Sequence, residues 1–214
     1  MLVDHKVAQL LCSRLCHDLA GPAGAVTAGL ELIEENGGDG AEAMDLVVRS
    51  ARQVVSRLNF YRLAFGSSGI ASAASLAEVR AAALSHFTGG LVGLDWPDSD
   101  GVRPSTAIAP PGPMLILNMI LLGAEALPRG GRLHMRISAL GNDLGLGMTA
   151  SGRGAGLRPE QRDAMRPEAA VESLSARTVP GYCVARIAGE HGIAVEVSDG
   201  AEDEMRIAAI LPGA

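Results

Sequence analysis

The apolar positions in the first third of the chain repeat with the spacing of two long helices. One helix is predicted over residues 3–35 and another over residues 41–65, with a glycine-rich break at 36–40 between them. At about 100° per residue, the apolar stripe of the first helix falls within about 45° of one direction and holds Leu11, Leu15, Leu19, Val26 and Ile33. The apolar seam of the second helix is heptad-like and holds Met44, Val47, Val48, Ala51, Val54, Val55, Leu58, Tyr61 and Phe65. Because the break is short, the two helices should pack antiparallel.

A lone two-helix hairpin cannot bury both of these apolar stripes. A second copy of the hairpin would cover them by forming a four-helix bundle. The pattern therefore predicts a homodimer through residues 1–65. The alternative is that the two helices pack against the rest of the same chain.

The pattern changes after the glycine- and serine-rich stretch 66–69, which predicts a domain boundary there. We divide the chain into a helical hairpin, residues 1–68, and a second domain, residues 69–214. A capping box formed by Ser75 and Glu78 opens the first helix of the second domain.

The second domain mixes helices with short strands. Strands are predicted at 91–96, 105–109, 132–139, 143–150, 193–198 and 204–211, and helices at 75–86, 114–127, 158–172 (in pieces) and 180–191. This order predicts an α/β sandwich with mostly antiparallel strands and one helical layer. The fold class of the whole chain is therefore α+β.

Composition restricts the classes of function. An aromatic content of 3% argues against carbohydrate clefts and single-strand stacking platforms, and a net charge of −6 argues against a general nucleic-acid binder. Three cysteines cannot make a disulfide framework, which fits a reducing compartment. The first fifteen residues lack the apolar core of a signal peptide, and no apolar stretch reaches the length of a membrane span. We expect a cytoplasmic protein that binds neither nucleic acid nor membrane.

His17 is the residue with the clearest chemical potential. It lies about 160° from the centre of the apolar stripe, so it should face solvent from the middle of the bundle. Asp18 follows directly and could hold the proton of one ring nitrogen while the other nitrogen acts as a nucleophile. Pro22 removes a backbone donor inside the same helix. An exposed helical histidine is usually a plain surface residue, so the spacing alone assigns no function.

The segment 13–22, Ser-Arg-Leu-Cys-His-Asp-Leu-Ala-Gly-Pro, resembles the phospho-acceptor box of sensor histidine kinases. The rest of the chain resembles a kinase catalytic domain that has lost its ATP-binding groups. Residues 117–131 resemble the N box, with Leu122 where kinases carry an Mg-binding Asn. Gly152 stands where the adenine-reading Asp would be, and residues 178–184 keep one glycine of the second glycine box.

An intact acceptor box followed by such a domain is similar to ChpT-type bacterial histidine phosphotransferases, over essentially the whole chain. The resemblance implies a cytoplasmic homodimer that neither binds nor hydrolyses ATP. His17 would accept a phosphoryl group from a receiver aspartate of a CckA-like hybrid kinase and pass it to response regulators of CtrA and CpdR type. The receiver would supply Mg²⁺, and this chain would hold no cofactor or metal. Asp18 would orient or activate His17, and we expect Arg14 and Pro22 to contact the partner.

Two other functions remain open on the sequence. An active histidine kinase core, or another ATPase of that fold, would bind ATP at the remnant pocket, which Leu122 and Gly152 argue against. A non-catalytic docking scaffold for receiver domains would make His17 incidental.

Several smaller motifs have simpler interpretations. Cys12, Cys16 and His17 have the wrong spacing for haem attachment and no fourth ligand cluster for zinc, so the cysteines are expected to be packing residues. The glycines at 152, 154 and 156 are a weak candidate for a phosphate cradle. Four further histidines lack an acidic neighbour in a motif and are expected to be structural or surface residues: His5, His86, His134 and His191. The arginines of the second helix, including Arg57, are expected on its solvated faces.

Overall fold

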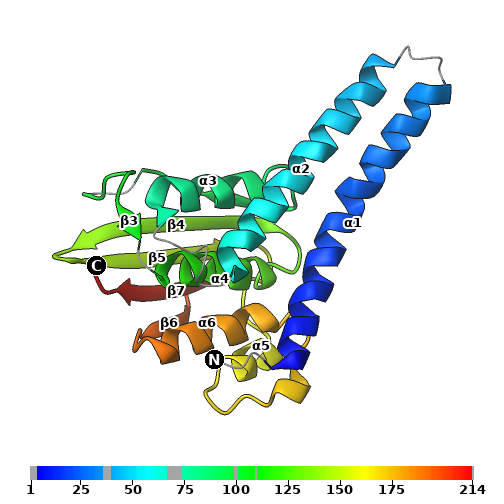
Figure 1. Cartoon of the computed structure of the whole chain (residues 1–214). Coiled ribbons are helices and arrows are strands. Elements are labelled where there is room, and N and C mark those ends of the chain that lie inside the picture. The colour runs from blue at the N-terminus through cyan, green and yellow to red at the C-terminus, as the bar shows by residue number, and fades with distance from the viewer. Residues whose placement is uncertain (1–3, 36–39, 67–73, 99–100, 109, 214) are drawn as a thin grey trace.

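The computed structural model describes residues 4–35, 40–66, 74–98, 101–108 and 110–213, and shows a long helical hairpin that extends from an α/β domain (Figure 1). The elements are α1 (His5–Glu35), α2 (Ala41–Phe65), β1 (Ala74–Ser75), α3 (Leu76–His86), β2 (Val92–Asp95), β3 (Ala107–Ile108), α4 (Gly112–Glu125), β4 (Gly131–Leu140), β5 (Asp143–Ser151), α5 (Pro159–Ala164), η1 (Val171–Ser173), α6 (Val179–Glu190), β6 (Val195–Asp199) and β7 (Glu204–Leu211). The α+β class is therefore confirmed. None of the described helices combines the length and the apolar character that a membrane crossing requires.

The helices α1 and α2 lie side by side and antiparallel, as the short break predicts (Figure 1). They approach closely at Gly29, where an added Cβ would lie 2.7 Å from Cγ2 of Val47 and 3.2 Å from the carbonyl oxygen of Ala43. A larger residue at this position would push the helices apart. The turn predicted at residues 36–39 lies outside the described residues.

The two ends of the hairpin have different surroundings. Near the second domain, Val7 on α1 and Phe60 and Ala64 on α2 are buried in the single chain. Elsewhere along α2, four apolar side chains of the predicted seam are exposed in the single chain: Met44, Val48, Val55 and Leu58. Thus the near end packs in part against the rest of the same chain, while apolar surface stays uncovered along α2 from Met44 to Leu58.

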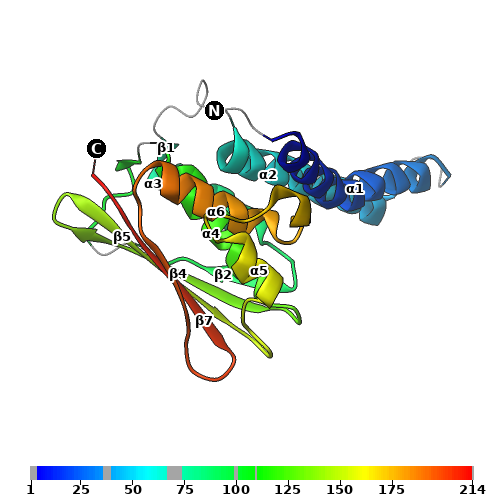
Figure 2. The same cartoon turned by 90° about the horizontal axis from the view of Figure 1, so that it is seen from below.

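The second domain is built on a five-stranded sheet in the order β2-β4-β5-β7-β6. The β2–β4 pair is parallel and the other three pairs are antiparallel. Buried residues alternate along β4 and β7, and they face α3, α4 and α6, which lie on one side of the sheet (Figure 2). The predicted sandwich with one helical layer is confirmed.

Local details mostly follow the sequence signals. Ser75 and Glu78 form the predicted capping box at the start of α3. The segment predicted as a strand at 105–109 is shorter, and it pairs with β1 instead of joining the main sheet. The boundary predicted between residues 68 and 69 lies in a stretch outside the described residues.

Candidate functional site

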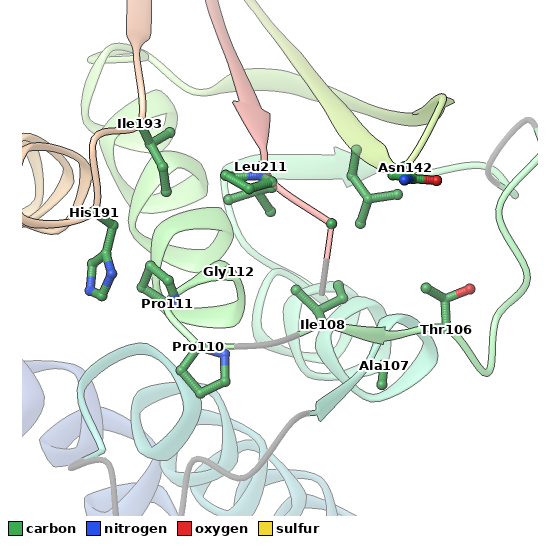
Figure 3. Close-up of a pocket in the computed structure, with 13 residues that line it drawn as sticks. Thr106, Ala107, Ile108, Pro110, Pro111, Gly112, Asn142, His191, Ile193 and Leu211 are labelled. Carbon is green, nitrogen blue, oxygen red and sulfur yellow. The ribbon is translucent and has the colours of Figure 1, made fainter.

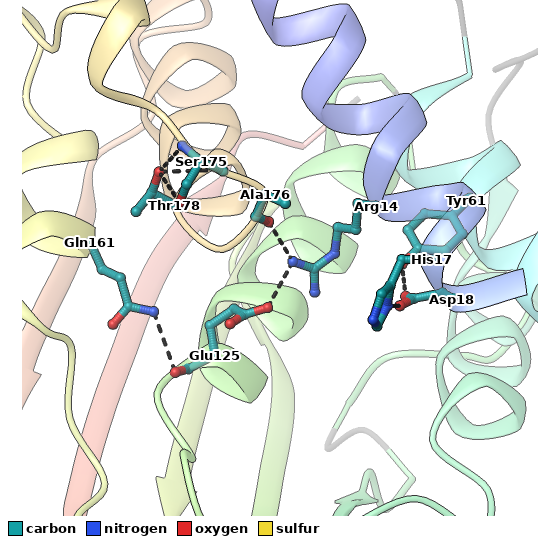
Figure 4. A network of polar contacts seen from close by, with 9 residues as sticks. All are labelled: Arg14, His17, Asp18, Tyr61, Glu125, Gln161, Ser175, Ala176 and Thr178. Atoms are coloured by element: carbon teal, nitrogen blue, oxygen red, sulfur yellow. Dashed lines mark hydrogen bonds and ion pairs between the residues drawn. The ribbon is translucent and has the colours of Figure 1, made fainter. Parts of the chain in front are cut away.

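His17 lies on the outer face of α1, with 88% of its side chain exposed (Figure 4). Its Nδ1 atom is 3.2 Å from Oδ1 of Asp18. A carboxylate can only accept hydrogen bonds, so this contact requires the proton on Nδ1. The lone pair of the ring then sits on Nε2. An exposed imidazole with a bare Nε2 has the properties of a nucleophile.

Asp18 is held from two sides. One carboxylate oxygen, Oδ1, faces His17, and the other, Oδ2, accepts a hydrogen bond from the hydroxyl of Tyr61 on α2. Burial alone would raise the pKa of this carboxyl, but the hydrogen bonds from Tyr61 and His17 and the charge of Arg14 bring it below its ordinary value. Asp18 is therefore ionised near neutral pH and available as the acceptor for Nδ1.

Pro22 explains a second contact at Asp18. In an α-helix the amide at position 22 would donate to the carbonyl oxygen of residue 18, and proline has no amide hydrogen. Arg57 of α2 supplies the missing donor, because its Nη1 donates to the backbone oxygen of Asp18. The expectation that Arg57 lies on a solvated face is therefore wrong. Pro22 itself is buried in the single chain, which does not favour its expected role as a contact for a partner.

Arg14, which is expected to contact a partner, is held by groups of the single chain. Its Nη1 lies 2.7 Å from Oε1 of Glu125, at the end of α4, and donates to the carbonyl oxygen of Ala176 at 2.9 Å (Figure 4). The side chains of Arg14 and Glu125 are only 13% and 20% exposed. The guanidinium therefore links α1 to the second domain within the single chain, and its contact with a partner stays a prediction.

The loop that holds Arg14 is itself fixed. Thr178 accepts a hydrogen bond at Oγ1 from the backbone nitrogen of Ser175, at 2.9 Å, which closes a turn around Ala176. Gln161 of α5 donates to the carbonyl oxygen of Glu125 at 3.3 Å. The turn around Ala176 therefore holds Arg14, and α5 holds the backbone of Glu125, so both members of the ion pair are fixed by neighbouring elements (Figure 4).

The positions that resemble lost ATP-binding groups are packed closely. Leu122 is fully buried in α4. A Cβ added at Gly152 would lie 2.6 Å from the carbonyl oxygen of Gly130 and 3.1 Å from Cα of Gly131, so a carboxylate could not be placed there without moving the backbone.

The glycines at 152, 154 and 156 do not form an open phosphate cradle. The amides of Gly152 and Gly154 donate to the backbone oxygen and the carboxylate of Asp203, at 3.0 and 2.7 Å, and the amide of Gly156 donates to Ala126 at 3.0 Å. Because these amides are used within the chain, they cannot cradle a phosphate in this conformation.

The cysteines of α1 and two histidines of the second domain are the other candidates for chemistry. Cys12 and Cys16 are exposed in the single chain, so the expectation that they are packing residues is wrong there. His86 is stacked on Phe60, with a ring-centroid distance of 4.1 Å. His134 does have an acidic neighbour, Asp95, with 2.7 Å between Nδ1 and Oδ2. Within the described ranges, no group of three or more His, Cys, Asp or Glu side chains could hold a metal ion.

A separate cavity of about 290 Å³ lies in the second domain (Figure 3). It is lined largely by apolar groups, among them Ile108, Pro111 and Leu211, with His191 at one side. It includes none of the residues that surround His17, so the candidate site is the exposed face of α1 and the residues behind it.

Sequence reasoning missed three residues of this site: Tyr61, Arg57 and Glu125. A tyrosine hydroxyl in an apolar seam needs a partner, and a proline inside a helix leaves a carbonyl without its donor. Those two signals could have pointed to Tyr61 and Arg57. No local signal marks Glu125 as the partner of Arg14.

Comparison with known proteins gives matches over most of the chain. The family model for the histidine phosphotransferase C-terminal domain matches residues 76–203. Protein phosphotransferase ChpT of Brucella abortus (strain 2308) is 34% identical over 195 residues, which cover 91% of this chain and 90% of that protein. A solved structure described as a bacterial phosphotransferase is 32% identical, with a TM-score of 0.76 over 98% of each chain.

Proposed function

Because this chain belongs to the family of ChpT-type histidine phosphotransferases, we propose that its phospho-acceptor is His17. The activity is phosphoryl transfer within a phosphorelay. The observation that carries the assignment is the state of the His17 ring, which is almost fully exposed and bonded only through Nδ1 to Asp18. A receiver domain can therefore approach Nε2 without a change in the hairpin.

The transfer step uses the lone pair of Nε2. This lone pair attacks the phosphorus of a receiver aspartyl phosphate in line; the new P–N bond forms as the P–O bond to the aspartate breaks, and the aspartate leaves as a carboxylate. Transfer onward reverses these changes, because the carboxylate of the next receiver attacks phosphorus and the electron pair of the P–N bond returns to Nε2.

Asp18 acts on the other side of the ring. When Nε2 becomes bonded to phosphorus, the imidazole gains positive charge, and the carboxylate at Nδ1 stabilises that charge. The same contact sets the tautomer before the reaction. Mg²⁺ bound by the receiver would offset the negative charge of the transferring group.

We include a homodimer in this proposal. The exposed apolar side chains along α2, such as Val48, Val55 and Leu58, form a surface that a second hairpin would cover. The two copies of His17 would then lie on the outside of one bundle. Its partners would be the receiver of a CckA-like hybrid kinase and regulators of CtrA and CpdR type, in the cytoplasm, as the resemblance implies.

The kinase-like domain is proposed not to bind ATP. Leu122 offers no oxygen or nitrogen to a metal ion, and the close packing at Gly152 leaves no space for an adenine-reading carboxylate. Calorimetric titration with Mg-ATP should give no binding heat. A micromolar dissociation constant would favour an active kinase core or ATPase instead.

The decisive experiment starts from a receiver domain of the CckA-like class that has been phosphorylated with radiolabelled acetyl phosphate. After mixing, label should appear on this chain, and it should be lost in acid and stable in alkali, as expected for phosphohistidine. If the receiver keeps its label while it binds the chain, the docking scaffold would be the better account.

A further inference from the structure

Tyr61 lies directly behind the nucleophile. The residue is 2% exposed, and its hydroxyl donates to Oδ2 of Asp18, the oxygen that does not face His17 (Figure 4). The hydroxyl, the carboxylate and the imidazole therefore form one chain of hydrogen bonds that runs from α2 to the surface of α1.

We propose that Tyr61 is a positioning residue for His17: by holding Oδ2 of Asp18 it turns Oδ1 toward Nδ1 of the ring and leaves Nε2 free for phosphorus. This inference rests on the proposed function, and it assigns to the relay a residue outside the acceptor box.

The geometry of a carboxylate explains the effect. Its two oxygens are fixed in one plane, so anchoring one oxygen sets the direction of the other. Asp18 sits on a half-open helix face, where an unanchored side chain would rotate between staggered positions. With the hydroxyl bond in place, the contact with His17 becomes the favoured arrangement.

The anchor itself is rigid. The ring of Tyr61 is packed against Phe60 edge-on at 5.6 Å, against Phe65 in a stack at 5.5 Å, and against His86 edge-on at 5.6 Å. Burial raises the pKa of the Tyr61 hydroxyl above its ordinary value. The hydroxyl therefore remains protonated, and it stays a donor throughout the physiological pH range.

The second domain contributes to the orientation of His17 through Arg14. Besides Tyr61, the titratable and charged groups that face Asp18 come from three helices: His17 and Arg14 on α1, Arg57 on α2 and His86 on α3. Arg14 also acts electrostatically on Tyr61, and the guanidinium of Arg14 is fixed by Glu125 of α4. The orientation of the nucleophile therefore depends on contacts that reach into the kinase-like domain.

The test compares the full-length wild type with Tyr61→Phe, which keeps the ring and removes the hydroxyl. Tyr182→Phe is the matched control, because Tyr182 is the other tyrosine of the chain and its ring contacts Arg186 on α6. The first readout is the tautomer of His17, from ¹⁵N NMR of ring-labelled histidine. The second is the rate at which label moves from a CckA-class receiver phosphorylated with acetyl phosphate.

In the wild type and in Tyr182→Phe, His17 should carry its proton on Nδ1. In Tyr61→Phe, the population with the proton on Nε2 should rise and the transfer rate should fall about tenfold, with the dimer intact. An unchanged tautomer, or a changed tautomer with an unchanged rate, would overturn the inference.

A double-mutant cycle tests whether Tyr61 affects the transfer rate through Asp18 or only through the stability of the fold. If Tyr61 acts through Asp18, then adding Tyr61→Phe to Asp18→Ala should not slow transfer further. A full tenfold loss in the double variant would overturn the positioning role. A wild-type chain that accepts no label would instead refute the proposed function, and the tautomers would still show whether Tyr61 orients the ring.

Discussion

The guanidinium of Arg14 forms an ion pair of 2.7 Å with the carboxylate of Glu125, although 111 residues separate them in the chain. Arg14 lies one turn before His17 on α1, and Glu125 is the last residue of α4. The pair joins the helix that carries His17 to the core helix of the second domain. This link gives the second domain a structural role, because it holds the helix that carries His17.

Breaking this pair should cost stability. Glu125→Gln leaves the part-buried Arg14 without its counter-charge, and we expect the free energy of unfolding to fall by about 2–3 kcal/mol, measured by denaturant titration. The control is Asp163→Asn, which breaks a surface ion pair with Arg166 at 3.2 Å and should change stability by less than about 0.5 kcal/mol. If Glu125→Gln lost no more stability than Asp163→Asn, the Arg14–Glu125 pair would not be a stabilising link between α1 and the second domain.

The contribution of Arg57 to the free energy of unfolding should depend on the presence of Pro22. Arg57→Met removes the donor to the carbonyl oxygen of Asp18, with an expected loss of about 1–2 kcal/mol. In a Pro22→Ala background the backbone amide can make that bond, so the same substitution should cost much less. Urea unfolding of the two single variants and the double variant measures the difference. Strictly additive costs would contradict this explanation.

His86 should make stability depend on pH. Burial lowers the pKa of its imidazole to about 4, from an unfolded value of 6.5. Between these values the unfolded chain binds a proton that the folded chain does not, so stability is retained above pH 6.5 and falls as the pH is lowered toward 4. The loss should reach about 2–3 kcal/mol.

The variant His86→Leu tests this assignment, because leucine cannot titrate. Thermal unfolding followed from pH 7 to pH 4 should show a flatter decline in the variant than in the wild type. An identical slope in both proteins would assign the pH dependence to other groups.

The apolar seam should determine association. Leu58→Asp places a charge on the exposed part of the seam, where a second hairpin would bury it without a partner, so the dimer should dissociate or the hairpin unfold. Ile210→Asp is the matched control, because Ile210 is an apolar residue of the second domain with similar exposure, 53% against 45% for Leu58. Sedimentation equilibrium measures whether each variant is a dimer or a monomer. A Leu58→Asp variant that stays dimeric would refute the four-helix bundle.

Much of the fold could be predicted because its signals are local. Helical periodicity gave α1 and α2 almost to the residue, and the Ser75–Glu78 pattern marked the start of α3. The exposure of His17 also followed from its angle relative to one apolar stripe. Each of these features depends on residues within a few turns of one another.

The contacts behind His17 could not be predicted in the same way. The pairing of Tyr61 with Asp18 depends on how far α1 slides against α2, and apolar stripes do not fix that shift. The partner of Arg14 depends on how the hairpin docks on α4. Both contacts join residues that are distant in sequence, so they require the assembled structure.

The central claim is that His17 alone accepts the phosphoryl group, and one substitution tests it most directly. His17→Ala is compared with the wild type and with His5→Ala, which removes an exposed histidine from the first turn of the same helix. Each protein is mixed with the phosphorylated receiver, and acid-labile label on this chain is counted. Because the exposed ring makes little packing contact, all three should keep the same dimer and nearly the same Tm. We predict label on the wild type and on His5→Ala and none on His17→Ala; label that persists on His17→Ala would contradict the account.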